Sequence, residues 1–252
     1  MNKTALITGA TSGIGKSTAI LLAQNNFNVI ITGRRKEKLD ELTDEIMQSS
    51  KCEVYSISFD ISKNEETEKA FHSIPEHLKK IDLLVNNAGL AAGLDKIQDG
   101  ILVDWESMID TNIKGLLYIT RLVVPGMIKR NVGQIINVGS IAGKEVYPAG
   151  NVYCATKAAV DSLTKAMRID LVEHGIRVTG VCPGMVETEF SDVRFKGDKT
   201  RAANVYKGLT PLCPDDIAEI ILFAATRPPH VNINDILVMP TAQASAGIVH
   251  RK

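Results

Sequence analysis

The residues of this chain that could do chemistry begin with Tyr153 and Lys157, which stand four positions apart in an alanine-rich stretch. On a helix, two side chains at this spacing lie on one face, about 5–6 Å apart at Cβ. A free tyrosine has a pKa near ~10, so about 4 kcal/mol is needed to bring it to ~7. One cation about 4 Å away supplies roughly that much in a partly screened site. The pair predicts a general acid/base near neutral pH, provided that other residues support it, because the spacing also arises by chance.

A glycine-rich turn near the beginning of the chain is the second candidate. It reads Gly9-Ala10-Thr11-Ser12-Gly13-Ile14-Gly15, after the apolar run 4–8 and before a helical pattern that extends to about residue 25. Glycines let the backbone approach a ligand, and the N–H groups at a helix start suit a pyrophosphate. We interpret the stretch as a dinucleotide-binding turn, with a simple tight turn as the alternative. Its spacing differs from the common Gly-x-Gly-x-x-Gly.

Two arginines follow the next apolar run, 28–32, after a glycine. In a dinucleotide-binding fold this strand end meets the adenosine ribose, and NAD enzymes usually place an acidic residue there. Arg34 and Arg35 stand at this point instead, and two guanidinium groups suit a 2′-phosphate. The pair predicts a preference for NADP. The alternative is that both are solvated residues at the start of the next helix.

Small and polar residues also end the later apolar runs. Because the carboxyl ends of parallel strands form one edge of a sheet, such residues leave room there for a ligand. Ser140 is among them, and its surroundings do not match the Gly-x-Ser-x-Gly of a hydrolase nucleophile. The residues in question are Asp60 after 52–59, Asn87, Ala88 and Gly89 after 81–85, Ser140 after 134–138, and Pro183 with Gly184 after 177–181.

The elements that must position these residues alternate along the whole chain. Apolar runs at 4–8, 28–32, 52–59, 81–85, 134–138, 177–181 and 235–239 predict strands, with helical patterns between them. Such alternation predicts an α/β fold, with a doubly wound parallel sheet in one domain of residues 1–252. A long helical pattern from residue 104 contains Asn112 and should end or kink at Pro125. The charged stretch 185–210, called the lid below, predicts a binding loop with some helix, and the tail 244–252 is too polar to pack alone.

Composition narrows the class of protein. The 252 residues are 44% hydrophobic and 23% charged, which is ordinary for a globular protein. Lys+Arg and Asp+Glu both total 29, so net charge gives no support for a nucleic-acid or membrane partner. No signal peptide or spanning run is recognised, and the four cysteines are widely spread, so we expect a cytoplasmic protein with reduced thiols. The five histidines lack metal-ligand spacing, and no metal is expected.

Taken together, these motifs resemble the classical short-chain dehydrogenase/reductases in order and spacing. The stretches 184–198 and 230–234 are more similar still to the NADP-dependent 3-hydroxy acid dehydrogenases, which act on serine, allo-threonine and 3-hydroxypropionate-like substrates. The resemblance covers essentially the whole chain. It implies NADP as cofactor, reversible hydride transfer at the 3-hydroxyl of a small 3-hydroxy acid, and a homotetramer to which the tail contributes.

The resemblance also implies a role for each matching residue. Tyr153 would be the catalytic acid/base, Lys157 would lower its pKa and bond the nicotinamide ribose, Ser140 would orient the substrate, and Asn112 would hold a water of a proton relay. The cofactor would be bound by Gly9, Ala10, Thr11, Ser12, Gly13, Ile14 and Gly15, by Arg34, Arg35, Asp60, Ile61, Asn87, Ala88 and Gly89, and by Pro183, Gly184, Val186 and Thr188.

A substrate carboxylate would need a cationic partner. Arg194 and Lys196 in the lid are the candidates, on the basis of charge and location. Two other functions remain open: a 3-oxoacyl-carrier-protein or general carbonyl reductase on the same fold, and a non-catalytic NADP-sensing protein. The second is less favoured because the chain keeps the tyrosine, lysine and serine.

Overall fold

The computed structural model describes residues 2–252 and is built around one seven-stranded parallel sheet. The strand order is β3-β2-β1-β4-β5-β6-β7, so the order reverses between β1 and β4, where doubly wound sheets bind ligands. The predicted fold class is confirmed. The strands are β1 Lys3–Ile7, β2 Phe27–Gly33, β3 Val54–Ser58, β4 Ile81–Asn86, β5 Gly133–Val138, β6 Ile176–Pro183 and β7 Asp235–Val238.

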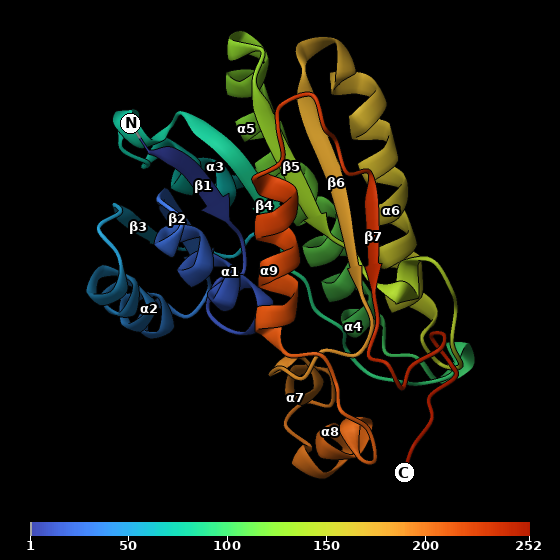
Figure 1. Cartoon of the computed structure of the whole chain (residues 1–252). Helices are drawn as coiled ribbons and strands as arrows, with labels where there is room; N and C mark the ends of the chain where they lie inside the picture. The colour runs from blue at the N-terminus through green and yellow to red at the C-terminus, as the bar shows by residue number, and fades with distance from the viewer. Residues whose placement is uncertain (1) are drawn as a thin grey trace.

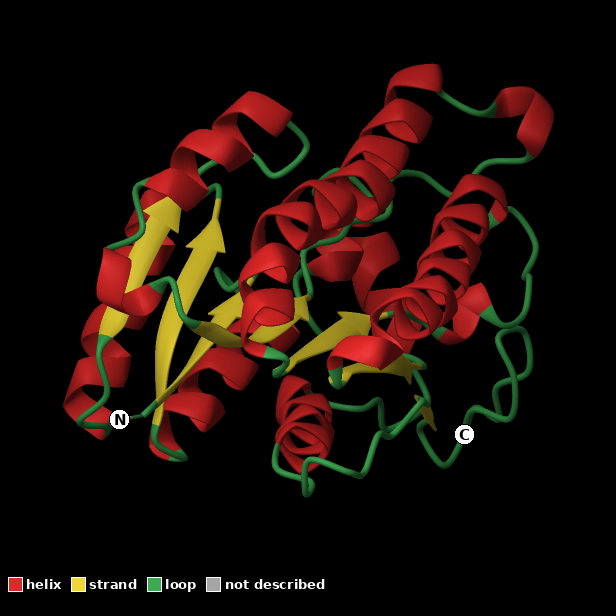
Figure 2. Ribbon diagram, turned by 90° about the horizontal axis from the view of Figure 1, so that it is seen from above, coloured by secondary structure: helices red, strands yellow, loops and turns green. Residues whose placement is uncertain are grey.

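The sheet lies between two layers of helices, each with its own core (Figure 2). Successive side chains of a strand point to opposite faces, so a strand covered on both sides is apolar throughout. In β1, Ala5 and Ile7 pack into one core and Leu6 into the other, and all three are at most 1% exposed. This is why the strands read as continuous apolar runs.

The helices divide between these two cores. Buried side chains of α1 Gly13–Gln24, α2 Lys36–Ser49 and α9 Pro214–Ala225 belong to the first core. Those of α5 Leu116–Arg130 and of the later turns of α6 Asn151–Leu171 belong to the second, while Tyr153 and Cys154 at the start of α6 belong to a small third cluster. The remaining α-helices are α3 Asn64–His72, α4 Leu102–Ile109, α7 Phe190–Arg194 and α8 Lys199–Tyr206.

The helical pattern that begins near residue 104 contains a turn that the sequence did not indicate, and of the end or kink expected at Pro125 the end is not observed. A π-helical turn, Asp110–Gly115, separates α4 from α5, and Asn112 lies in it. The helix does not end at Pro125, because α5 continues to Arg130. Val123 and Met127 on either side of the proline are at most 3% exposed, and their burial holds the helix together past the lost backbone hydrogen bond. Asn131, with φ of 49°, ends it.

The lid and the tail lie at the same end of the molecule, beyond the carboxyl end of β6 (Figure 1). The lid contains α7 and α8. The Arg251 guanidinium donates to the carbonyl oxygens of Val205 and Lys207, and the Lys252 amide donates to that of Gly208 at 2.9 Å. The tail is therefore fastened to the lid by backbone carbonyls. Among residues 2–252, no helix is long and apolar enough to cross a membrane.

Candidate active site

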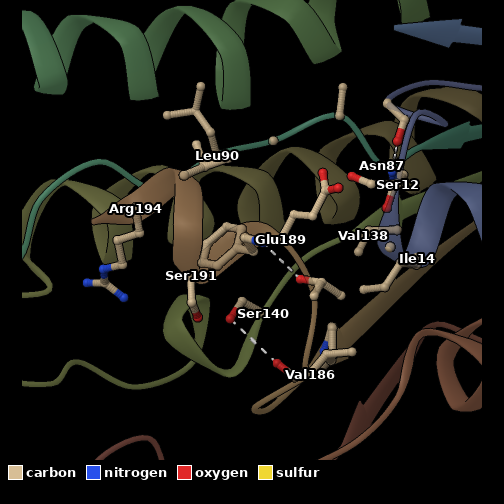
Figure 3. A pocket seen from close by; sticks show the side chains of 18 of the residues that line it. Ser12, Ile14, Asn87, Leu90, Val138, Ser140, Val186, Glu189, Ser191 and Arg194 are labelled. Atoms are coloured by element: carbon tan, nitrogen blue, oxygen red, sulfur yellow. Dashed lines mark hydrogen bonds between the residues drawn. The ribbon is translucent and has the colours of Figure 1, made fainter. Parts of the chain in front are cut away.

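A cavity of about 540 Å³ lies at the carboxyl ends of β1, β2, β4, β5 and β6, under the lid. Most of the residues singled out from the sequence line it, although they come from loops far apart in the chain. Figure 3 looks into this cavity, with Ser12, Ile14 and Asn87 on one side of the view and Arg194 and Ser191 on the other. The predicted residues that line it are Gly9, Thr11, Ser12, Gly13, Ile14, Arg34, Arg35, Asp60, Ile61, Asn87, Ala88, Gly89, Ser140, Tyr153, Lys157, Pro183, Gly184, Val186, Thr188 and Arg194.

Four predicted residues are not part of the lining: Ala10, Gly15, Asn112 and Lys196. Ala10 is fully buried, and its amide donates to Thr32 O at 2.8 Å. Lys196 pairs instead with the Asp104 carboxylate at 2.8 Å, and its side chain is 56% exposed. The structure therefore favours Arg194 over Lys196 as the cation available to a bound molecule.

Tyr153 and Lys157 project from the first two turns of α6 into the cavity, and both are nearly buried. The Lys157 ammonium donates to Val138 O at 3.0 Å, and burial lowers its pKa to about 8. Burial also raises the pKa of Tyr153, and the Ser140 hydroxyl acts in the opposite direction. The spacing predicted a lowered tyrosine pKa, whereas the protein's own groups raise it. The reason is that removal of water disfavours the phenolate by more than its neighbours favour it.

Ser140 follows β5, and its hydroxyl both accepts and donates a hydrogen bond. Its oxygen accepts from the Ala142 amide at 3.1 Å, as the N-cap of the short helix Ile141–Gly143. The hydroxyl donates to Pro183 O at 3.5 Å, which is long for a hydrogen bond. A group in the cavity could therefore replace this weak partner.

Asn112 is 2% exposed and braces the loop after β4. Its Nδ2 donates to Leu90 O and Thr156 Oγ1, and its Oδ1 accepts from the Leu90 amide. A Cβ built on Gly89 would lie 3.2 Å from Asn112 Oδ1 and 3.5 Å from Lys157 Nζ. The Asn112 oxygen and the Lys157 ammonium therefore both lie within contact distance of the Gly89 position.

The glycine turn brings the backbone close to the cavity wall. Gly9 and Gly13 have φ of 68° and 52°, in the left-handed region that favours glycine. A Cβ on Gly15 would collide with the Gly9 carbonyl oxygen, so this position leaves no space for a side chain. Asn87 Nδ2 donates to Thr8 O and Gly9 O, which fixes the turn against β4. The first turn of α1 has no acidic residue, and the Ser12 side chain does not cap it.

The two arginines have different surroundings. Within residues 2–252, the exposed Arg34 guanidinium forms no hydrogen bond or ion pair. Arg35 Nη1 pairs with Glu189 Oε2 at 2.8 Å, and its Nη2 donates to Thr11 Oγ1 and Ser12 Oγ, both at 3.0 Å. Arg35 therefore connects the lid to the glycine turn.

Arg194 occupies the far side of the cavity. Its Nε donates to Gly93 O at 3.1 Å and its Nη1 to Tyr147 Oη at 3.0 Å. The guanidinium lies 5.7 Å from the centre of the Tyr153 ring, and the Phe190 ring lies 5.6 Å from the same centre. A fixed cation thus stands beside the tyrosine that could exchange a proton.

Several lining residues were missed by the sequence reasoning. Glu189 and Phe190 lay in a stretch noted only as a whole, and Tyr147, Tyr206, Gln243 and Ala246 carried no signal of their own. A second cluster was missed outside the cavity. Asp161, Cys182 and Asp235 have ligand atoms within 4.8 Å of one another, but the Lys144 ammonium is bonded to both carboxylates. We interpret this cluster as an ion-pair network.

A family model for the short chain dehydrogenases matches residues 3–199. The chain belongs to the short-chain dehydrogenase family. It is 48% identical over 248 residues, 98% of each chain, to the NADP-dependent 3-hydroxy acid dehydrogenase of Salmonella typhi. It is 47% identical over 251 residues to the one of Schizosaccharomyces pombe, covering 99% of this chain and 97% of the other.

Solved structures of serine dehydrogenases superimpose on nearly the whole chain. The closed form of a serine dehydrogenase complexed with NADP+ superimposes with a TM-score of 0.93 at 45% identity, covering 99% of this chain and 100% of the other. Serine dehydrogenase from Escherichia coli gives 0.83 at 41% identity, over 96% and 99%. The similarity therefore includes the lid and the tail as well as the sheet.

Proposed function

We propose that this short-chain dehydrogenase transfers hydride reversibly between NADP and the 3-hydroxyl of small 3-hydroxy acids. One observation carries the proposal: Tyr153, Lys157 and Ser140 line the same cavity as the glycine turn and the two arginines. The relatives named as NADP-dependent 3-hydroxy acid dehydrogenases cover nearly the whole chain and support the substrate class. The substrates would be of the serine, allo-threonine or 3-hydroxypropionate type.

The residues present fit NADP. The uncapped start of α1 offers N–H groups and partial positive charge to a pyrophosphate. The close approach of Gly15 to the Gly9 carbonyl leaves the turn without side chains on that side. Arg34 is free for a 2′-phosphate, and the loop at Asp60 and Ile61 lines the adjacent wall for an adenine. When bound, NADP supplies the hydride acceptor or donor of the reaction.

The chain's own residues would move and hold the proton. In the oxidation direction, the Tyr153 phenolate takes the proton of the substrate hydroxyl while the carbon loses hydride. Ser140, whose bond to Pro183 O is long, would bond the same substrate oxygen. Lys157 would stabilise the phenolate, and the space it shares with Asn112 Oδ1 could hold a water that returns the proton to solvent.

Because burial raises the pKa of Tyr153, proton uptake at neutral pH needs additional positive charge beside the phenol. Arg194 and the ammonium of Lys157 are the protein's contributions. Arg194 is also the proposed partner of the substrate carboxylate, since it lines the cavity and its guanidinium is already oriented by Gly93 and Tyr147. A charge-assisted pair of this kind contributes about 1.5–3 kcal/mol.

Assembly as a homotetramer is part of the proposal. Large apolar side chains remain exposed on several elements. Leu102 of α4 and Ile169 of α6 are 68% and 75% exposed, and Phe223 of α9 and Leu237 of β7 are 46% and 49% exposed. A closed tetramer needs self-complementary surfaces, and exposed apolar side chains of this kind are candidates to form them. A cytoplasmic location fits four cysteines that form no disulfide among residues 2–252.

The test is NADP+ reduction at mildly alkaline pH across a panel of short hydroxy acids of both hands, with ketones and acyl thioesters assayed in the reverse direction. We expect the highest kcat/KM for 3-hydroxy acids. Tyr153→Phe should abolish turnover and leave NADP+ binding near that of the wild type. Retained turnover would reject the role of Tyr153, and a preference for acyl thioesters would assign the protein to the reductases instead.

A further inference from the structure

The Arg35 guanidinium is shared between the lid and the glycine turn, and Glu189 is its lid partner. The two side chains pair at 2.8 Å, and hydrogen bonds from Arg35 and Ser12 hold the pKa of Glu189 below its usual range. Glu189 is therefore a carboxylate at neutral pH. It lines the same cavity as Arg34, Arg35 and Ser12, and Figure 3 shows it between Ser12 and the Arg194 side of the view.

At this position the Glu189 carboxylate would repel a second anion bound beside Arg35. The proposed function, on which this inference rests, places a 2′-phosphate at Arg34 and Arg35. A phosphate that reached Arg35 would meet a guanidinium whose Nη1 already donates to Glu189, and it would meet the negative charge of that carboxylate. By contrast, a ribose 2′-hydroxyl is a hydrogen-bond donor that a carboxylate accepts, which is the arrangement that NAD enzymes use.

We propose that Glu189 is a specificity-determining residue that weakens the preference for NADP over NAD by competing with the 2′-phosphate for Arg35. Arg34 carries no such competitor and attracts the phosphate in full. The two arginines thus contribute unequally, and the lid residue at the N-cap of α7 sets the difference.

The ion pair can have this effect without being important to the fold. The two side chains are 45% and 48% exposed, and pairs of that exposure contribute little to stability. Replacing Glu189 by glutamine keeps its size and removes only its charge. The folded protein should tolerate this change, whereas a doubly charged phosphate in the same cavity should respond to it.

The experiment is calorimetric titration of the full-length protein with NADP+ and with NAD+, for the wild type, Glu189→Gln and Glu187→Gln. Glu187 is the matched control, because it is an exposed acid two residues away that does not line the cavity. In Glu189→Gln, the ratio of the Kd for NAD+ to the Kd for NADP+ should rise about three- to tenfold. In Glu187→Gln it should stay within about twofold of the wild type, since the added distance is screened by salt.

An unchanged ratio in Glu189→Gln would overturn the inference. So would an equal shift for both cofactors, because that result assigns Glu189 to holding the lid and not to reading the phosphate. These outcomes leave the proposed function intact as long as the wild type prefers NADP+. If the wild type binds NADP+ no more tightly than NAD+, the proposed cofactor preference itself is wrong.

Discussion

Burial of the Lys157 ammonium should make the stability of the protein depend on pH in a defined window. The side chain is 7% exposed, it donates to Val138 O, and its pKa is lowered from 10.5 to about 8. Between these two values the unfolded lysine is protonated and the folded one is largely neutral. The unfolded state then binds more protons, so the free energy of unfolding rises with pH.

The magnitude follows from the shift. One proton corresponds to about 1.36 kcal/mol per pH unit, so the gain from pH 8 to pH 10 is roughly 2 kcal/mol. Below pH 8 both states hold the proton and the contribution of Lys157 is constant. The raised pKa of Tyr153 acts only above its ordinary value of 10.0, outside this window.

The assay is urea unfolding at half-unit steps from about pH 7 to pH 10 without added cofactor, for the wild type and Lys157→Met. The difference in free energy of unfolding between the two proteins is the relevant quantity. Cys182, whose pKa burial raises to about 11, also titrates near this range. Subtraction removes the part of its titration that is independent of Lys157, and the remainder belongs to the coupling of the two groups, since the Cys182 thiolate raises the pKa of Lys157. We expect the free energy of unfolding of the wild type to increase relative to that of Lys157→Met as pH rises. Parallel profiles would refute the reasoning that burial dominates the titration of Lys157.

Three further predictions follow from single contacts. Gly15→Ala places a Cβ against the Gly9 carbonyl and should weaken NADP+ binding at least about tenfold in calorimetric titration, whereas Gly247→Ala, with nothing within 4 Å of its Cβ, should not. Arg194→Met should raise the KM for 3-hydroxypropionate about ten- to hundredfold. Lys196 lies outside the cavity, so an equal effect of Lys196→Met would contradict the assignment of Arg194 to the substrate carboxylate. Lys144→Met leaves Asp161 and Asp235 without their shared partner and should lower the free energy of unfolding in urea by about 1–3 kcal/mol. The control Lys165→Met removes a more exposed ammonium from Asp161 and should lower it by less than about 0.5 kcal/mol.

The fold and the centre of the site could be predicted from the sequence because their signals are local. A parallel strand covered on both sides is a continuous apolar run, and β1 shows this in the division of Ala5, Leu6 and Ile7 between two cores. The residues after each strand fall at one sheet edge whatever the loops do. Ser140 and the glycine turn are therefore expected at one edge without any knowledge of tertiary contacts, and Tyr153 is expected near them because its helix follows the same loop as Ser140.

The electrostatics could not be predicted in the same way. Spacing on a helix gives the proximity of Tyr153 and Lys157, but the pKa of each depends on how much water the surrounding loops remove. The segments that remove it include the lid, where the ring of Phe190 at the start of α7 lies 5.6 Å from that of Tyr153. The sign of the tyrosine shift was accordingly wrong, although the residue was correctly placed in the cavity.

The lid shows why contacts between distant segments escape a reading of the sequence. Arg35 and Glu189 are 154 positions apart, and neither has a neighbour in the sequence that indicates the other. A guanidinium after β2 is equally compatible with a phosphate, a solvated surface or a lid carboxylate, and only the position of α7 distinguishes them. The same lid carries Arg194 five residues after Glu189. One short segment therefore touches the proposed phosphate site at its start and Tyr153, the proposed acid/base, at its end. Any movement of α7 must change both contacts together, and cofactor preference and substrate binding in this protein are therefore expected to be coupled through the lid.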